Sequence, residues 1–181
     1  MNDQSRKLAE TAEEHLRERR SDEACRCLEE AAGAEEDRGT KAQLWQRAAE
    51  VYAEDRSTEN AGRCYRKASL LLEGQEKADC LLAWWRHLIL AIAGCQWDCS
   101  FEWRGETDGS HDADHEYYQG AIARYREEAE RVLREALSIE GIRTSGIIKE
   151  AKRECRRREK DGWGAKICWS IVAEVTGKGK R

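Results

Sequence analysis

The chain of 181 residues contains no proline, and valine and threonine are scarce in it. Valine and threonine are typical of β-strands, and proline breaks helices, so its absence leaves long helices uninterrupted. No stretch alternates apolar and polar residues as a half-buried strand would. Alanine, glutamate, arginine, lysine and leucine, which favour helices, are abundant. The sequence therefore predicts an all-α fold.

The chain also lacks an excess of charge of one sign. Charged residues make up 38% of it, yet the formal net charge is −4, and acids and bases are interleaved. This balance favours solvated helix faces over a dedicated nucleic-acid or membrane surface. The longest apolar run, residues 81–93, is too short to span a bilayer and contains Arg86 and His87. No transmembrane segment and no nucleic-acid partner are therefore expected.

A signal peptide is not expected either, because residues 1–5 have no apolar core. Without such a signal, the eight cysteines are expected to be reduced thiols or metal ligands rather than a disulfide framework. Five of them fall on apolar helical positions and are expected to be small buried side chains: Cys25, Cys64, Cys80, Cys155 and Cys168. The predicted compartment is the cytoplasm.

An internal repeat is the main feature that the chain does contain. The residues that carry it are Trp45, Ala48, Ala49, Tyr52, Ala61, Tyr65 and Ala68. The same offsets recur 37 residues earlier from Leu8, where they place polar Thr11 and His15 on the packing face. Small residues let two antiparallel helices approach closely, and large ones fill the grooves beside them. Ser21 and Thr58 stand where the second helix of each pair needs an N-cap.

The second unit of this pattern resembles the tetratricopeptide repeat, W-x2-L-G-x2-Y followed by A-x3-F. Alanine replaces Leu and Gly of that pattern, and Glu73 stands where its proline would be. The resemblance implies one domain over residues 1–181, a right-handed α-α superhelix of about seven to eight antiparallel helices. The expected repeats are 5–38, 42–75, 78–137 with a loop insertion at 95–114, and 146–175. Residues 51–68 are also similar to repeats of soluble NSF attachment proteins, helical adaptors that link membrane-fusion complexes to an ATPase.

The second half is expected to build the later repeats around an apolar central helix at 78–94. Its partner helix is expected over 115–137, where Ala129, Leu133 and Ala136 repeat the small–large–small pattern. A last pair is predicted from six residues at matching offsets: Ile148, Ala151, Cys155, Gly164, Cys168 and Ile171.

The predicted function is a protein–protein interaction module or adaptor rather than an enzyme. It would bind a peptide or helix of a partner protein in a groove lined by the first helix of each repeat. The candidate partner-binding residues are Glu13, Arg17, Gln46, Glu50, Arg86, Trp97 and Trp103. The basic stretch 149–160 could meet phosphates or an acidic partner, although its interspersed glutamates favour a solvated face with local ion pairs. A small oligomer is compatible with this interpretation.

A zinc-stabilised binding module is the alternative. Cys95 and Cys99, followed by His111 and His115, nearly fit the spacing of a site with two cysteine and two histidine ligands. Such a site would clip together the polar insertion at 95–115, and no cofactor other than zinc is expected. A helical metal-dependent hydrolase built on His111–Asp112, with His87 and Asp114, is less favoured. That chemistry needs the pair on a rigid helix, whereas a loop is expected after Gly109 and Ser110.

Overall fold

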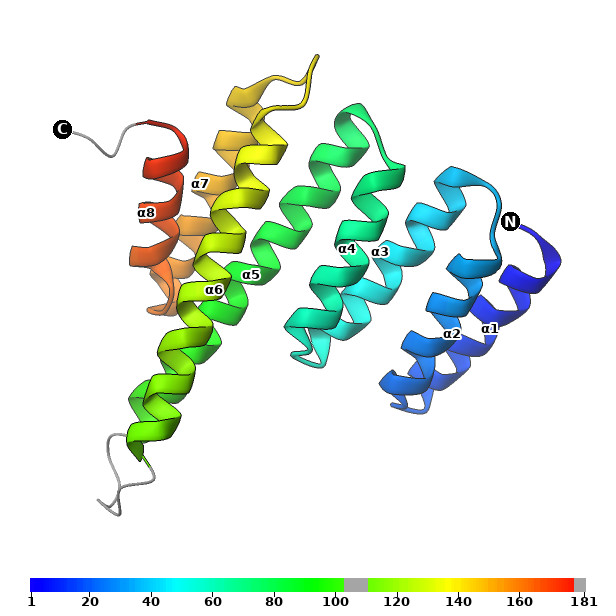
Figure 1. Ribbon diagram of the computed structural model, residues 1–181, viewed down its shortest axis with the longest axis horizontal. Helices are drawn as coiled ribbons and strands as arrows, with labels where there is room; N and C mark the ends of the chain where they lie inside the picture. The colour runs from blue at the N-terminus through cyan, green and yellow to red at the C-terminus, as the bar shows by residue number, and fades with distance from the viewer. Residues whose placement is uncertain (103–110, 178–181) are drawn as a thin grey trace. The chain divides into compact units, whose positions relative to one another are not determined.

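The computed structural model describes the backbone of residues 1–102 and 111–177, and the side chains of residues 1–98 and 115–177. Within these residues the chain forms eight α-helices and no strand (Figure 1). The predicted all-α class is therefore confirmed. The chain divides into two compact units, Met1–Trp84 and Trp85–Arg181, and the division falls inside the long helix α5 (Gly74–Glu102).

The first unit contains α1 (Asp3–Arg17), α2 (Ser21–Ala34), α3 (Arg38–Glu54), α4 (Thr58–Leu71) and the start of α5. Each of α1 to α4 packs against the next along the chain, as the ribbon in Figure 1 shows. Asn2 and Asp37 cap α1 and α3 by accepting a backbone N–H, each at 2.8 Å. Neither Ser21 nor Thr58 caps its helix, because each is the first helical residue, so that expectation was wrong.

One turn geometry joins the helices of both hairpins in this unit. Arg19 and Arg56 both have φ of +59°, and they stand 37 residues apart, the spacing that the sequence predicts. The next residue of each turn reaches back over the helix end, from Arg20 N–H to the His15 carbonyl and from Ser57 N–H to the Tyr52 carbonyl. This closing bond is typical of a helix that ends in a left-handed residue.

Alanines and large side chains alternate in the core of the first unit, as predicted. Trp45 is 7% exposed and Tyr65 is 4% exposed. The alanines of the repeat pattern have no exposed surface: Ala12, Ala24, Ala31, Ala48, Ala49, Ala61 and Ala68. Thr11 was misplaced by the sequence pattern, because it is exposed and its hydroxyl donates to the Lys7 carbonyl within its own helix. His15 is half-buried.

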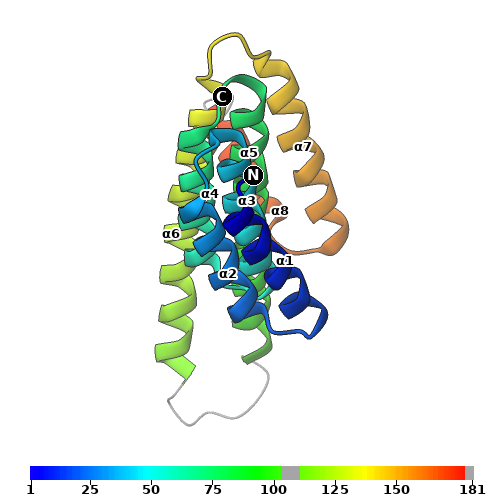
Figure 2. The same ribbon diagram turned by 90° about the vertical axis from the view of Figure 1, so that its right-hand side faces the viewer.

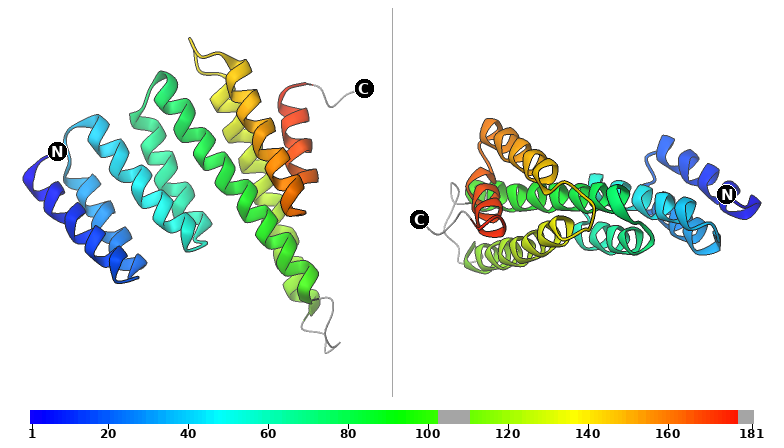
Figure 3. Two further views of the ribbon diagram at one scale, coloured as in Figure 1. Left: turned by 180° about the vertical axis from the view of Figure 1, so that it is seen from behind. Right: turned by 90° about the horizontal axis from the view of Figure 1, so that it is seen from above.

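The second unit is made by α5 from Trp85 onward, α6 (His111–Leu137), α7 (Thr144–Asp161) and α8 (Ala165–Val175). Helix α8 packs against both α6 and α7 and lies between them (Figures 2 and 3). The predicted core residues Ala129, Leu133 and Ala136 are buried on α6. On α7, Ala151 and Cys155 are buried as predicted, whereas Ile148 is half-buried and Ile147 is buried in its place.

A disulfide between Cys155 and Cys168 ties α7 to α8, with the two Cα atoms 5.4 Å apart. Both side chains are buried, as predicted, but the expectation of reduced thiols was wrong for this pair. The sequence pattern placed Cys155 and Cys168 at facing positions of two paired helices, but it did not predict a bond between their sulfur atoms. Disulfides are rare in the reducing cytosol. The cytoplasmic location thus stays a prediction without support from these two cysteines.

The predicted insertion at 95–114 is mostly helical. Helix α5 continues to Glu102 and α6 begins at His111. Residues 95–102 contain no glycine or proline to end a helix, which explains why α5 runs on. Over Gly74–Asp98, α5 is long and apolar enough to cross a membrane by length and composition alone. However, 56% of its apolar window is buried against the protein, as in the core helix of a soluble protein.

Candidate functional site

The exposed side of α1 and α3 carries four of the predicted partner-binding residues. Arg47 on α3 contacts Glu13 on α1 at 3.2 Å and Glu50 on its own helix at 3.5 Å. Arg17 is exposed and Gln46 is half-buried. We call these five residues the α1–α3 face. A shallow hollow of about 560 Å³ lies along α1, and Glu13 and Arg17 are among its lining residues.

Glu29 on α2 is contacted by side chains of both α3 and α4. Arg63 on α4 contacts Glu29 on α2 at 2.6 Å, and the Tyr52 hydroxyl donates to Glu29 at 2.8 Å. Burial and the Glu29 carboxylate raise the pKa of Tyr52, so this hydroxyl stays protonated. Glu29, whose side chain is 21% exposed, is thus engaged by α3 and α4, whereas Arg17 on the α1–α3 face is exposed.

A cluster of arginines lies where α5 meets α7 in the second unit. Arg86 on α5 contacts Glu150 on α7 at 3.2 Å, and Arg153 approaches the same carboxylate at 3.7 Å. Glu154 is 4% exposed and contacts Arg157 at 3.2 Å. These five side chains surround a small polar pocket of about 120 Å³. The charges of the two glutamates are therefore matched by arginine, and positive charge remains in excess.

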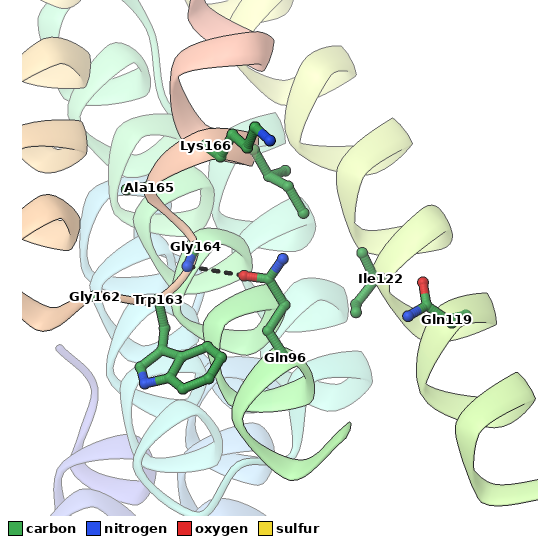
Figure 4. Close-up of a pocket in the computed structure, with 9 residues that line it drawn as sticks. Gln96, Gln119, Ile122, Gly162, Trp163, Gly164, Ala165 and Lys166 are labelled. Atoms are coloured by element: carbon green, nitrogen blue, oxygen red, sulfur yellow. Dashed lines mark hydrogen bonds between the residues drawn. The ribbon is translucent and has the colours of Figure 1, made fainter. Parts of the chain in front are cut away.

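Two tryptophans meet at the other end of the same pair of helices. Trp97 on α5 is 50% exposed, and its ring meets that of Trp163 edge-on, with centroids 5.6 Å apart. Trp163 stands in the turn between α7 and α8. This turn is fixed to α5 because Gly164 N–H donates to Gln96 Oε1 at 2.8 Å (Figure 4).

An open pocket of about 520 Å³ adjoins this turn. Gln96 of α5 and Ile122 of α6 face each other across it, and Trp163 forms part of its wall (Figure 4). The start of α8 closes one side, with Lys166 at the rim. The lining combines apolar side chains with amide groups and one amine.

The structure separates the predicted binding residues into two groups. Glu13, Arg17, Gln46 and Glu50 belong to the first unit, and Arg86 and Trp97 belong to the second. Trp103 lies outside the described residues. The pattern did not single out Arg47 or Trp163, whose roles depend on which helices pack together. Glu13 and Arg47 are 34 residues apart, close to the 37-residue spacing of the repeats, and this is the signal that could have identified Arg47.

The predicted zinc ligands lie at the facing ends of α5 and α6. Cys95 and Cys99 are four residues apart on α5, and His111 and His115 are four apart on α6. Cys95 is half-buried and His115 is exposed, whereas the side chains of Cys99 and His111 lie outside the described residues. The described side chains contain no group of three or more potential metal ligands.

The hydrolase alternative used residues in the same region. His111 and Asp112 begin α6 rather than lying in a loop, so the expected loop position was wrong. The side chains of both, and that of Asp114, lie outside the described residues. His87 is buried and 8% exposed. Burial lowers the pKa of its imidazole, which is therefore neutral at pH 7.

Comparison with known proteins adds no relative to this description. No protein family, no curated protein and no solved structure matches the chain. The functional assignment accordingly depends on the residues and their geometry.

Proposed function

We propose that the chain is a protein-interaction module whose odd-numbered helices bind a peptide or helix of a partner protein. In this proposal the helical hairpins form a superhelix like that of tetratricopeptide repeats, and the first helix of each hairpin lines its groove. The partner is a protein rather than a nucleic acid, and the chain performs no catalysis itself.

The α1–α3 face is the observation that carries the proposal. Glu13 on α1 and Glu50 on α3 are both joined to Arg47, which holds the two helices together while both carboxylates stay about half exposed. Arg17 and Gln46 extend from the same helices and offer hydrogen-bond donors. Side chains that are fixed in place lose little entropy when they bind, which favours recognition of a polar segment.

Site-specific photo-crosslinking from the full chain tests this proposal. A photoreactive amino acid replaces Arg17 or Gln46, and matched controls carry it at exposed Arg26 on α2 or Glu59 on α4. We expect one partner to be captured reproducibly from both α1–α3 positions in cell extract and only weakly from the control positions. Equal capture from all four positions, or no reproducible partner, would contradict the proposal.

A zinc-stabilised version of the module remains the second proposal. It is supported by the two ligand pairs, each spaced by four residues, at the facing ends of α5 and α6. Metal analysis after mild purification should find about one zinc per chain. The metal should be lost in Cys95→Ser/Cys99→Ser and kept in Cys27→Ser, which changes a cysteine on α2. Clearly less than about one zinc in the unmodified protein would rule this version out.

A further inference from the structure

A stripe of three partly exposed side chains, Arg86, Leu90 and Trp97, runs along α5 in the second unit, with the buried Ala93 between Leu90 and Trp97. Arg86, Leu90 and Trp97 fall within about 40° of one another around the helix axis, because one turn takes about 3.6 residues. Leu90 is 47% exposed and Trp97 is 50% exposed, high values for large apolar side chains. From Arg86 to Trp97 the stripe is about 16 Å long, which matches three turns of a bound helix.

The neighbouring helix α7 adds positive charge at one end of this stripe. Arg153 and Arg157 have side chains 69% and 57% exposed, and they border the small polar pocket with Arg86. Glu150 and Glu154 partly hold these guanidinium groups in place. Three arginines against two glutamates leave a surplus positive charge that can meet the carboxylates of a ligand.

Aromatic surface lies at the opposite end. Trp97 keeps half of its surface exposed although its ring contacts Trp163. The turn that carries Trp163 is itself attached to α5 through Gln96 and Gly164 (Figure 4). Tryptophans held in this way are typical anchors of protein interfaces.

We infer that the α5–α7 surface, made by Arg86, Leu90, Trp97, Arg153, Arg157 and Trp163, binds a short acidic amphipathic helix of another protein. Its carboxylates pair with the arginines at one end, and its aliphatic or aromatic side chains pack on Leu90 and Trp97 at the other. The inference rests on the proposed function in taking the ligand to be a protein segment, and it adds a site and a composition for that segment.

The charges on this surface favour a protein helix over a single-stranded nucleic acid. Glu150 and Glu154 lie among the arginines and would repel the continuous line of phosphates of a nucleic acid strand. A helix can place separate carboxylates next to Arg153 and Arg157 and avoid both glutamates. Leu90 also offers aliphatic surface, whereas nucleotide bases bind mainly by stacking on aromatic rings.

Selection from a random library of peptides of about 16 residues, with the full chain as bait, tests the inference. We expect selected peptides to combine several Asp or Glu with Leu, Phe or Trp at helical spacing. Their affinities are then measured by fluorescence anisotropy. Arg153→Glu/Arg157→Glu should weaken binding at least about tenfold, and Trp97→Ala should do the same while Trp97→Phe retains most of the affinity.

Arg124→Glu/Arg143→Glu is the matched control, because it makes the same charge change on α6 and in the α6–α7 connection. It should change the affinity by less than roughly twofold. Circular dichroism of every variant separates lost binding from lost folding. The affinity of the unmodified protein should also fall as salt is raised, which measures the charge contribution without any substitution.

Each other outcome overturns the inference. Selected peptides that bind the Arg153→Glu/Arg157→Glu protein as tightly as the unmodified one would refute this site and leave the proposed function standing. Failure to enrich any peptide would count against both. A labelled single-stranded oligonucleotide that binds through Trp97 and both arginines, and that acidic peptides do not displace, would assign the surface to nucleic acid instead.

Discussion

Gly164 packs closely against α5 because it has no side chain. Its φ is +74°, a left-handed conformation, and an added Cβ would lie 3.1 Å from the Cβ of Ala93 on α5. Gly164→Ala is therefore expected to lower the free energy of unfolding by about 2 kcal/mol, from backbone strain and the close contact together. Urea unfolding followed by circular dichroism measures this difference.

Gly146→Ala is the matched control for this substitution. Gly146 lies within α7, and a Cβ there would meet no atom within 4 Å. Because alanine favours helices, we expect this variant to be as stable as the unmodified protein or more stable by up to about 1 kcal/mol. Equal stability of the Gly164→Ala and Gly146→Ala proteins would show that the α7–α8 turn does not need glycine.

His87 makes the stability of the protein depend on pH. Burial lowers the pKa of its imidazole below the ordinary value of 6.5, and Nε2 has no hydrogen-bond partner among the described residues. Near pH 6.5 the imidazole of His87 therefore binds a proton in the unfolded chain but stays neutral in the folded protein. Stability should consequently fall as the pH drops below that value.

His87→Leu removes this titration. We expect the variant to lose less free energy of unfolding than the unmodified protein between about pH 7 and about pH 5, as measured by urea unfolding at each pH. An unchanged pH dependence in His87→Leu would show that another group is responsible.

At the scale of the helices, the Cys155–Cys168 disulfide attaches α8, the shortest described helix, to α7. Helix α8 has 11 residues, and Cys168 joins it to Cys155 on α7 across a separation of 13 residues. Closing a loop of this size stabilises a protein by about 3 kcal/mol. Adding a reductant should therefore lower the thermal midpoint of the unmodified protein and leave that of Cys155→Ala/Cys168→Ala unchanged. Equal midpoints of the unmodified protein with and without reductant would contradict this role.

The helices of the first unit could be predicted because the spacing of small and large residues within each helix shows which side is buried. Ala61, Tyr65 and Ala68 on one helix need only the helical period to show which side is buried. The end of α5 could not be placed in the same way, since no breaker stands before the region that the structure leaves undescribed. The contacts of Arg47 and Trp163 depend on which helices become neighbours, and no local pattern encodes that.

At the scale of the whole molecule, the proposed binding side chains other than Trp163 lie on odd-numbered helices in both units. The α1–α3 face and the α5–α7 surface each join two helices through an arginine that contacts glutamate on the neighbouring helix. In contrast, Glu29 on α2 is engaged with Arg63 and Tyr52 inside the first unit. The proposed function therefore predicts a division of roles, in which odd-numbered helices bind the partner and even-numbered helices support them.

Hydrogen exchange followed by mass spectrometry, with and without the tightest selected peptide, tests this division most directly. Binding should slow amide exchange in α1 and α3 or in α5 and α7, and leave α2, α4 and α6 unchanged. Slower exchange confined to the even-numbered helices, or no change in any helix when the peptide is saturating, would contradict it.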